Sequence, residues 1–150
     1  MKILFLDIDG VLNNDRSTYY PDKTLPYPLS VLDKKCIEFL NEIVERTKCK
    51  IVISSSWRHH GIPAIQKLFD QMQMPEIYDV TPDFFYKAPY YCRGDEIKEW
   101  LDQHTDVTHY CILDDNYIIL DEQTEHFVLV DEAVGLTNED KIKAIQILTK

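Results

Sequence analysis

The length, composition and charge of the chain restrict its class. A chain of 150 residues with 45% hydrophobic content is long and apolar enough for one globular domain, residues 1–150, with a core of its own. A formal net charge of −10 argues against nonspecific binding of nucleic acid or anionic membrane over the whole surface. Asp7 and Asp9 interrupt the apolar start and no small-residue cleavage site follows, so we expect a cytoplasmic protein that does not engage a membrane.

In chain order, short apolar runs alternate with helical periods. Strands are predicted at Lys2–Leu6, Lys50–Ser54, Ile77–Val80, Tyr110–Leu113 and His126–Val130. Helices are predicted after Ser30, which would form a capping box with Asp33, near Pro63, around EIKEWL with Asp95 as a cap, and from Thr137 and Asp140. Because most strands are continuously apolar, the sequence predicts an α/β fold, a three-layer αβα sandwich with a mainly parallel five-stranded sheet.

Polar residues follow three of the predicted strands. The first, second and fourth strands run into Asp7 and Asp9, into Ser54, Ser55 and Ser56, and into Asp114 and Asp115, respectively. Ligands of open parallel sheets bind outside these carboxyl ends, so the polar groups are expected to converge. Four carboxylates on one rim repel one another unless a cation neutralises them, and an all-oxygen set suits Mg²⁺ better than zinc. Taken alone, the Asp-x-Asp pair is equally compatible with a strand-end turn.

The ordered set of these signals resembles a known superfamily. DIDGVLN after an apolar strand, a serine ending the second strand, a basic residue opening a later helix and an acidic pair after the fourth strand are similar to the haloacid dehalogenase-like (HAD) hydrolases. KIVISSSWR, RGDEIKEWL, ILDDN and VGLT most resemble the HAD domain of Swiss Army Knife RNA-repair proteins and, more distantly, the phosphatase module of polynucleotide kinase-phosphatases. The resemblance implies a Rossmann-like, nearly capless fold, since only residues 13–29 separate the first motif from the first predicted helix.

The resemblance also implies catalytic roles for the acids. Asp7 would be the nucleophile that forms an aspartyl-phosphate from a phosphomonoester. Asp9 would act first as general acid toward the leaving oxygen and then as general base toward water. Asp7, the backbone carbonyl of Asp9 and Asp115 would bind Mg²⁺, with Asp114 as a further acid of the metal site or an orienter of the following turn. The implied activity is that of a Mg²⁺-dependent phosphatase.

Phosphate binding is expected from serine and a basic residue. Ser54 would bind a phosphoryl oxygen through its hydroxyl and backbone N–H, with Ser55 next to it, although three consecutive serines leave this assignment open by one residue. The third motif of the family usually supplies a lysine. Arg93 occupies the most similar place here, where a loop enters a helix, and can contact phosphate in a bidentate manner. Lys98 and Lys87 remain the alternatives.

The substrate class stays open at this level. A nearly capless site admits a polymer, and Arg58 beside Trp57 is expected to hold a phosphodiester of an RNA or DNA end while loop aromatics stack on bases. These aromatics are Tyr19, Tyr20, Tyr27, Phe84, Phe85, Tyr86, Tyr90 and Tyr91. Aromatic residues in loops also commonly pack into small hydrophobic clusters beside the main core, which is the alternative to a substrate contact. The remaining alternatives are a small-metabolite phosphatase such as a nucleotidase and a noncatalytic phosphate- or protein-binding module.

Overall fold

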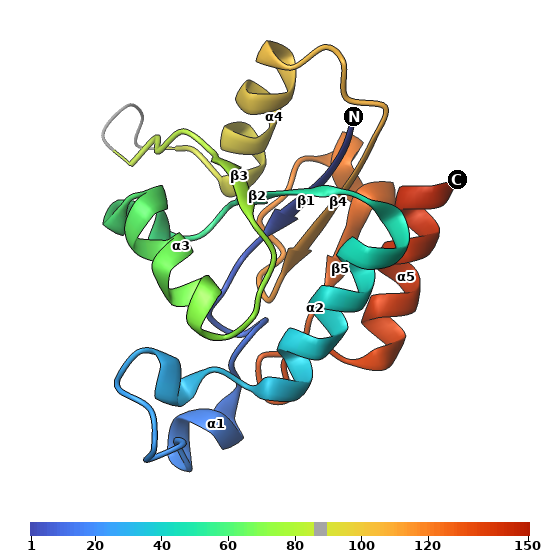
Figure 1. Ribbon diagram of the computed structural model, residues 1–150. Helices are drawn as coiled ribbons and strands as arrows, with labels where there is room; N and C mark the ends of the chain where they lie inside the picture. Colours follow the sequence, from blue (N-terminus) through green and yellow to red (C-terminus); the bar gives the residue numbers. More distant parts are fainter. Residues whose placement is uncertain (86–89) are drawn as a thin grey trace.

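A parallel sheet lies between two layers of helices in the computed structural model, which describes residues 1–85 and 90–150 (Figure 1). Within those residues the strands are β1 (Lys2–Leu6), β2 (Lys50–Ile53), β3 (Ile77–Val80), β4 (His109–Asp114) and β5 (Phe127–Leu129). The α-helices there are α1 (Asp15–Tyr19), α2 (Lys34–Thr47), α3 (Ile62–Gln71), α4 (Arg93–Gln103) and α5 (Asn138–Thr149). The strand order is β3-β2-β1-β4-β5, and all neighbouring strands are parallel, which confirms the predicted fold class.

Alternation along the strands gives the sheet two apolar faces. Leu4 and Leu6 of β1 belong to the larger core, which is completed by side chains of α2, α3 and α5. Phe5 of β1 points to the opposite face, where its ring packs edge-on against Trp100 of α4 with centroids 5.4 Å apart. Figure 1 shows α4 on the far side of the sheet from α2 and α5. Both faces of the sheet are therefore covered, as continuously apolar strands require.

The strand order creates a switch point between β1 and β4. From β1 the chain goes to β2 and β3 on one side of the sheet, then crosses to β4 and β5 on the other side. The ladder continues past β1, because the N–H of Asp7 donates to the carbonyl of Leu113 at 3.0 Å and the N–H of Ser54 donates to that of Leu6 at 2.9 Å. Asp7 and Asp114 consequently lie side by side at the edge where ligands of such sheets bind.

Two predicted helix caps are wrong. The first predicted helix, α2, begins at Lys34 rather than after Ser30, and Asp33 is its N-cap, accepting from the N–H groups of Lys35 at 2.8 Å and Cys36 at 3.2 Å. Ser30 instead lies in a short 3-10 helix, Leu29–Val31. In α4 the aspartate at position 95 is not the cap itself: its carboxylate accepts from the N–H of Cys92, the N-cap, at 2.8 Å. An acid at the third helical position can accept from the backbone N–H of the N-cap residue, which is the second half of a capping box.

Helix α1 was not predicted, whereas the cap of α5 was. Asn14 and Ser17 form a capping box at the start of α1, with the N–H of Ser17 donating to the Asn14 side chain at 2.9 Å. Five residues are too few to show a helical period, which explains the omission. The start of the closing helix, predicted at Thr137 and Asp140, is confirmed, and the two residues form a capping box with reciprocal hydrogen bonds of 3.0 and 3.2 Å.

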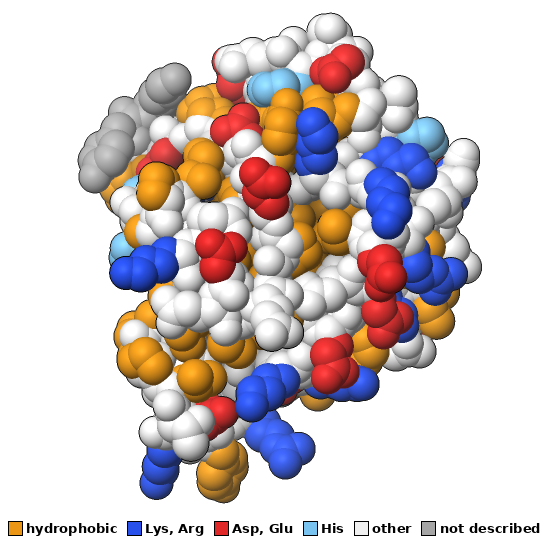
Figure 2. All heavy atoms as spheres, in the orientation of Figure 1, with side chains coloured by type: hydrophobic (Ala, Val, Ile, Leu, Met, Phe, Trp, Pro, Cys, Tyr) orange, Lys and Arg blue, Asp and Glu red, His pale blue; other side chains and the backbone are white. Residues whose placement is uncertain are grey.

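The distribution of surface charge and the apolar character of the helices are relevant to binding of nucleic acid and of membranes. On the described part of the face shown in Figure 2, acidic and basic side chains are interspersed rather than separated into fields of one sign. A helix that could span a membrane is not found among the described residues, because none combines the necessary length with sufficient apolar character. Tyr86 and Lys87, two of the predicted substrate contacts, lie outside the described residues.

Candidate active site

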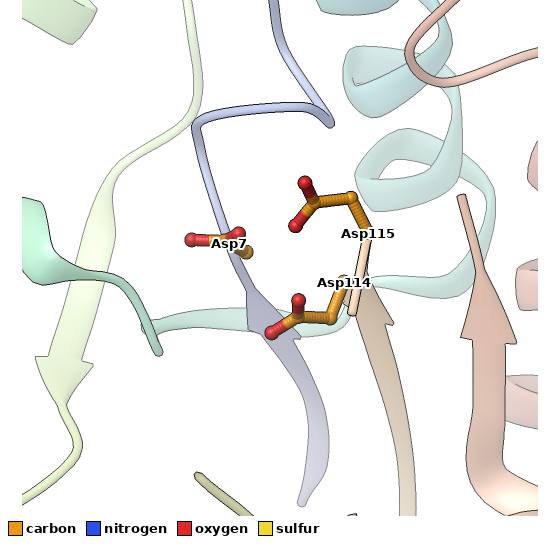
Figure 3. Close-up of side chains that lie close together, drawn as sticks. All are labelled: Asp7, Asp114 and Asp115. Atoms are coloured by element: carbon orange, nitrogen blue, oxygen red, sulfur yellow. The ribbon is translucent and has the colours of Figure 1, made fainter. Parts of the chain in front are cut away.

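Three carboxylates meet at the switch point of the sheet. Asp7 follows β1, Asp114 is the last residue of β4, and Asp115 comes next. One oxygen from each lies within 4.8 Å of the others. Figure 3 shows the side chains of Asp114 and Asp115 extending from the end of β4 toward Asp7. Asp7 and Asp114 are buried, with exposed fractions of 6% and 1%, so their charges are poorly screened by water.

Gly10 lets the turn after β1 approach this cluster. Its φ angle is +80°, in the left-handed region that favours glycine. A Cβ atom at this position would lie 2.4 Å from Oδ2 of Asp115, closer than any real contact. The N–H of Gly10 donates to Oδ1 of Asn13 at 2.7 Å, which closes the turn. The DIDG sequence thus supplies both the acids and the close approach of the backbone to the second acidic strand end.

Arg93 joins the two strand ends electrostatically. Its Nη1 lies 2.6 Å from Oδ2 of Asp114 and 3.3 Å from Oδ1 of Asp7. Helix α4 can bring Arg93 there because Gly94 packs against the chain near Leu120, whose backbone nitrogen would be 2.6 Å from a Cβ at position 94. Among the alternatives, Lys98 faces away and pairs with Asp102 at 2.8 Å, while Lys87 is outside the described residues.

Burial and mutual repulsion change the acidity of the cluster. Burial, reinforced by the charge of Asp114, raises the pKa of Asp7 from 3.8 to about 7, although Arg93 acts in the opposite direction. Burial and the same neighbour raise the pKa of Asp115 to about 6. In the metal-free protein, protons and a cation therefore compete for the same oxygen atoms near neutral pH.

The raised pKa of Asp7 predicts that the stability of the metal-free protein depends on pH. A carboxyl whose pKa is higher in the folded state binds protons more tightly when folded, so its contribution to stability is lost as pH rises. We expect the free energy of unfolding of the wild type, relative to Asp7→Asn, to decrease as pH rises from about 4, near the ordinary pKa, to above about 7. Chemical denaturation of both proteins in chelator across this range measures the difference. A pH-independent difference would contradict the raised pKa of Asp7.

Asp9 lies at the opening of the site and is held by two donors. Its side chain is exposed, its Oδ1 accepts from Nδ2 of Asn13 at 2.9 Å, and its Oδ2 accepts from Nε1 of Trp57 at 3.1 Å. A cavity of about 350 Å³ lies here, with Asp9, Asn13, Asp115 and Tyr27 among its lining residues. The carboxylate of Asp9 does not belong to the group of three, and the predicted metal contact of its backbone carbonyl stays a prediction.

The serines after β2 lie on the side of the nucleophile candidate. Ser54 and Ser55 are buried, with exposed fractions of 1% and 0%, whereas Ser56 is exposed. The hydroxyl of Ser55 accepts from the N–H of Trp57 at 3.3 Å and, by hydrogen bonding, acts to lower the pKa of Asp7. Within the described part of the chain, the buried Oγ of Ser54 has no hydrogen-bond partner. A buried hydroxyl without a partner is costly, so this atom is available for a ligand.

Arg58 lies apart from the carboxylate cluster. Its Nη2 is 2.9 Å from Oε1 of Glu96 and 3.4 Å from Oδ1 of Asp83, and its Nη1 donates to Oγ1 of Thr81 at 3.3 Å. The arginine side chain is only 9% exposed. Because protein carboxylates already engage this guanidinium, it connects the 3-10 helix after β2 (Ser56–His60) to α4. Its contact with a substrate phosphate stays a prediction.

Three residues with clear roles in this geometry were missed or given another role by the sequence analysis. Glu96 is 1% exposed although it lies in a charged helical run, and its helix position next to Ile97, which is fully buried, was the available signal. Asn13 follows the DIDG turn closely enough to bond back to it, as asparagine often does. Trp57 was considered only as an aromatic, and nothing in its sequence position indicates that its N–H reaches Asp9.

Comparison with known proteins identifies the family of the chain. Residues 3–141 match the family model described as the HAD domain in Swiss Army Knife RNA repair proteins. No curated protein and no solved structure matches the chain. The match includes the acids after β1 and β4, the serines after β2 and the arginine that opens α4, and a HAD domain indicates a phosphatase-type hydrolase. The chain therefore belongs to the family of HAD domains found in Swiss Army Knife RNA repair proteins.

Proposed function

We propose that this protein hydrolyses phosphomonoesters with the help of Mg²⁺ through an aspartyl-phosphate on Asp7. The observation that carries the proposal is the meeting of Asp7, Asp114 and Asp115 with Arg93 at the switch point of the sheet. Carboxylates alone would repel a phosphate dianion. A cluster that also contains a guanidinium and can take up a cation offers both a nucleophile and positive charge for the phosphoryl oxygens.

The charge and chemistry of the cluster fit a divalent ion. Three carboxylates against one guanidinium leave a formal surplus of two negative charges when all are ionised. The donors are all oxygen, as Mg²⁺ prefers. Asp7, Asp114 and Asp115 would hold the ion, and when bound it would neutralise charge on a phosphoryl oxygen. HAD domains generally use Mg²⁺, which agrees with this donor set.

The first step breaks the substrate ester. A carboxylate oxygen of Asp7 attacks phosphorus, the bond between phosphorus and the leaving oxygen breaks, and that oxygen takes a proton from Asp9. Arg93 lies 3.3 Å from Oδ1 of Asp7 and is positioned to stabilise negative charge on the phosphoryl group. The hydroxyl of Ser54, which is buried without a partner among the described residues, is suited to donate to a phosphoryl oxygen.

The second step regenerates the enzyme. Asp9, now a carboxylate, takes a proton from water while the water oxygen attacks phosphorus. The acyl-phosphate bond breaks, Asp7 returns to its carboxylate form and inorganic phosphate leaves. Because Asp9 is exposed at the opening of the site, water reaches it without a conformational change. The hydrogen bonds from Asn13 and Trp57 keep its carboxylate oriented between the two steps.

The proposed substrate is a phosphorylated end of RNA or DNA, and a small phosphomonoester is the alternative. The family description names RNA repair, and segment 13–31 adds only the five-residue α1 and a 3-10 helix beside the site, so the opening can admit a polymer. Exposed aromatics near it include Tyr27, whose exposed fraction is 82%. Base stacking on such rings is tolerant of sequence.

Removal of the metal tests the proposal directly. With a chromogenic phosphate as substrate, we expect turnover to require Mg²⁺, to stop in chelator and to fall by about a hundredfold or more in Asp115→Asn, because a cation ligand is lost. The same substitution should raise the thermal stability of the metal-free protein, since it removes one of three repelling charges.

The control for this test is Asp106→Asn. Asp106 is exposed in the loop before β4, at the opposite end of the strand, so its replacement should change neither turnover nor the response to Mg²⁺. Full turnover in chelator would contradict the metal requirement. Tight phosphate binding without turnover of any phosphomonoester in Mg²⁺ would instead identify the noncatalytic module.

A further inference from the structure

A second cavity lies beside the candidate active site, on the far side of Trp57. Its volume is about 320 Å³, and Tyr27, Trp57, Leu68, His60 and Lys67 are among its lining residues. We call it the Trp57 cavity. Figure 2 shows hydrophobic side chains at the edge of the molecule between α3 and the chain that follows α1, the region to which these residues belong. Its size is at the lower end of the range for sites that hold small organic groups.

Two contacts connect this cavity with the reacting groups. Trp57 lines the cavity, and its Nε1 donates to Oδ2 of Asp9 at 3.1 Å. Tyr27 lines both the Trp57 cavity and the neighbouring cavity that contains Asp9 and Asp115. A group bound against the indole of Trp57 would therefore lie next to the carboxylate that protonates the leaving oxygen in the proposed function.

The in-line geometry of the proposed reaction indicates which part of the substrate would occupy the Trp57 cavity. In an in-line displacement the leaving group departs opposite the nucleophile, and its oxygen must come within hydrogen-bond reach of the general acid. With Asp7 as nucleophile and Asp9 as acid, the body of the leaving group lies on the Asp9 side. We propose that the Trp57 cavity binds the base of a nucleoside leaving group, an inference that rests on the proposed phosphatase function.

The lining chemistry favours a nucleobase over an aliphatic chain or a bare sugar. Tyr27 and Trp57 line the cavity with aromatic rings, against which a planar heterocycle can stack, and Leu68 adds an apolar wall. His60 and Lys67 provide hydrogen-bond donors for the polar edge of a base or for a neighbouring phosphate. A sugar without a base would leave the apolar wall uncovered, and an aliphatic chain would form no hydrogen bond with either of these two exposed polar side chains.

Tryptophan fluorescence tests the occupant without turnover. The protein has two tryptophans, and Trp100 is 3% exposed with its Nε1 bonded to Asp79 at 2.8 Å, so a ligand in the cavity reports through Trp57. We expect adenosine to quench the wild type in a saturable manner and methyl riboside to have no effect. The quench should vanish in Trp57→Phe, and Tyr27→Ala should weaken adenosine binding by roughly tenfold.

The matched control is Tyr78→Ala, which removes an exposed tyrosine in β3 that lines neither cavity beside Asp9. Adenosine binding should be unchanged there. Equal binding of methyl riboside and adenosine, or a quench that persists in Trp57→Phe, would overturn the assignment of the cavity.

Turnover separates this inference from the function on which it rests. In Mg²⁺, a nucleoside monophosphate should be hydrolysed with a lower KM than ribose 5-phosphate, and Tyr27→Ala should remove that preference by raising KM for the nucleotide alone. Equal KM values in the wild type would overturn the base site while leaving the phosphatase intact. Adenosine binding without hydrolysis of either compound or of a phosphorylated trinucleotide would overturn the phosphatase and leave the base site. Tighter binding of a phosphorylated trinucleotide than of the mononucleotide would identify a polymer end as the source of the base.

Discussion

Asp7→Asn should abolish phosphatase turnover, with a loss of about a thousandfold or more, while the fold persists. The substitution removes the nucleophilic oxygen but keeps the size of the side chain, and Asp7 is buried between two strand ends that stay paired through backbone hydrogen bonds. It also removes a carboxyl whose pKa is raised to about 7, so the metal-free variant should be at least as stable as the wild type.

Rapid-quench labelling distinguishes loss of the nucleophile from loss of binding. The wild type should accumulate an acid-stable, hydroxylamine-sensitive phosphoenzyme, and Asp7→Asn should show none. Asp106→Asn serves again as the control, because this exposed acid lies at the other end of the sheet. Wild-type turnover in Asp7→Asn, or phosphoenzyme in that variant, would rule out Asp7 as the nucleophile.

Arg93→Ala should reduce both stability and turnover. The guanidinium compensates two carboxylates, and removing it leaves Asp7 and Asp114 facing each other in a site where Asp114 is 1% exposed. Breaking a buried ion pair costs about 3–5 kcal/mol, and because the arginine side chain is 18% exposed we expect the free energy of unfolding to fall by about 3 kcal/mol at neutral pH in chelator. Mg²⁺ should restore part of this loss, since it supplies the missing positive charge.

The catalytic part of this prediction applies to every substrate. In the proposed function Arg93 contacts the transferred phosphoryl group rather than the leaving group, so turnover of a small chromogenic phosphate and of a nucleotide should fall together, by about a hundredfold. Lys98→Ala is the matched control, because Lys98 is in the same helix but pairs with Asp102 on the surface. A large loss in Lys98→Ala with little change in Arg93→Ala would assign the third motif to the lysine.

The class of the fold and the convergence of the acids follow from local sequence patterns. β1 and β3 have the predicted bounds, because Asp7 ends the apolar run of β1 and Thr81-Pro82 ends the short β3. The three positions that carry Asp7, Asp114 and Asp115 come directly after or at the end of such runs. Parallel strands bring their carboxyl ends to one edge, so their meeting could be predicted without knowing a single contact.

Contacts between distant segments could not be predicted in this way. Arg58 and Glu96 are 38 positions apart, and their ion pair depends on how the 3-10 helix after β2 packs against α4. The sequence alone favoured Arg58 at the substrate edge, because it follows the serines and lies beside Trp57 near the loop aromatics. In the fold, burial of this guanidinium requires a carboxylate partner, and Glu96 provides it.

By itself, the sequence determined that acids, serines and a basic helix start share one edge of a parallel sheet, because those features depend only on strand ends and helix starts. Tertiary structure decided which groups touch: Arg93 bridges Asp7 and Asp114, and Trp57 donates to Asp9 and lines a cavity with Tyr27. Side-chain direction and burial depend on the packing of segments far apart in the chain. Only the folded arrangement therefore gives Arg93, Trp57 and Asp9 their positions around the candidate active site.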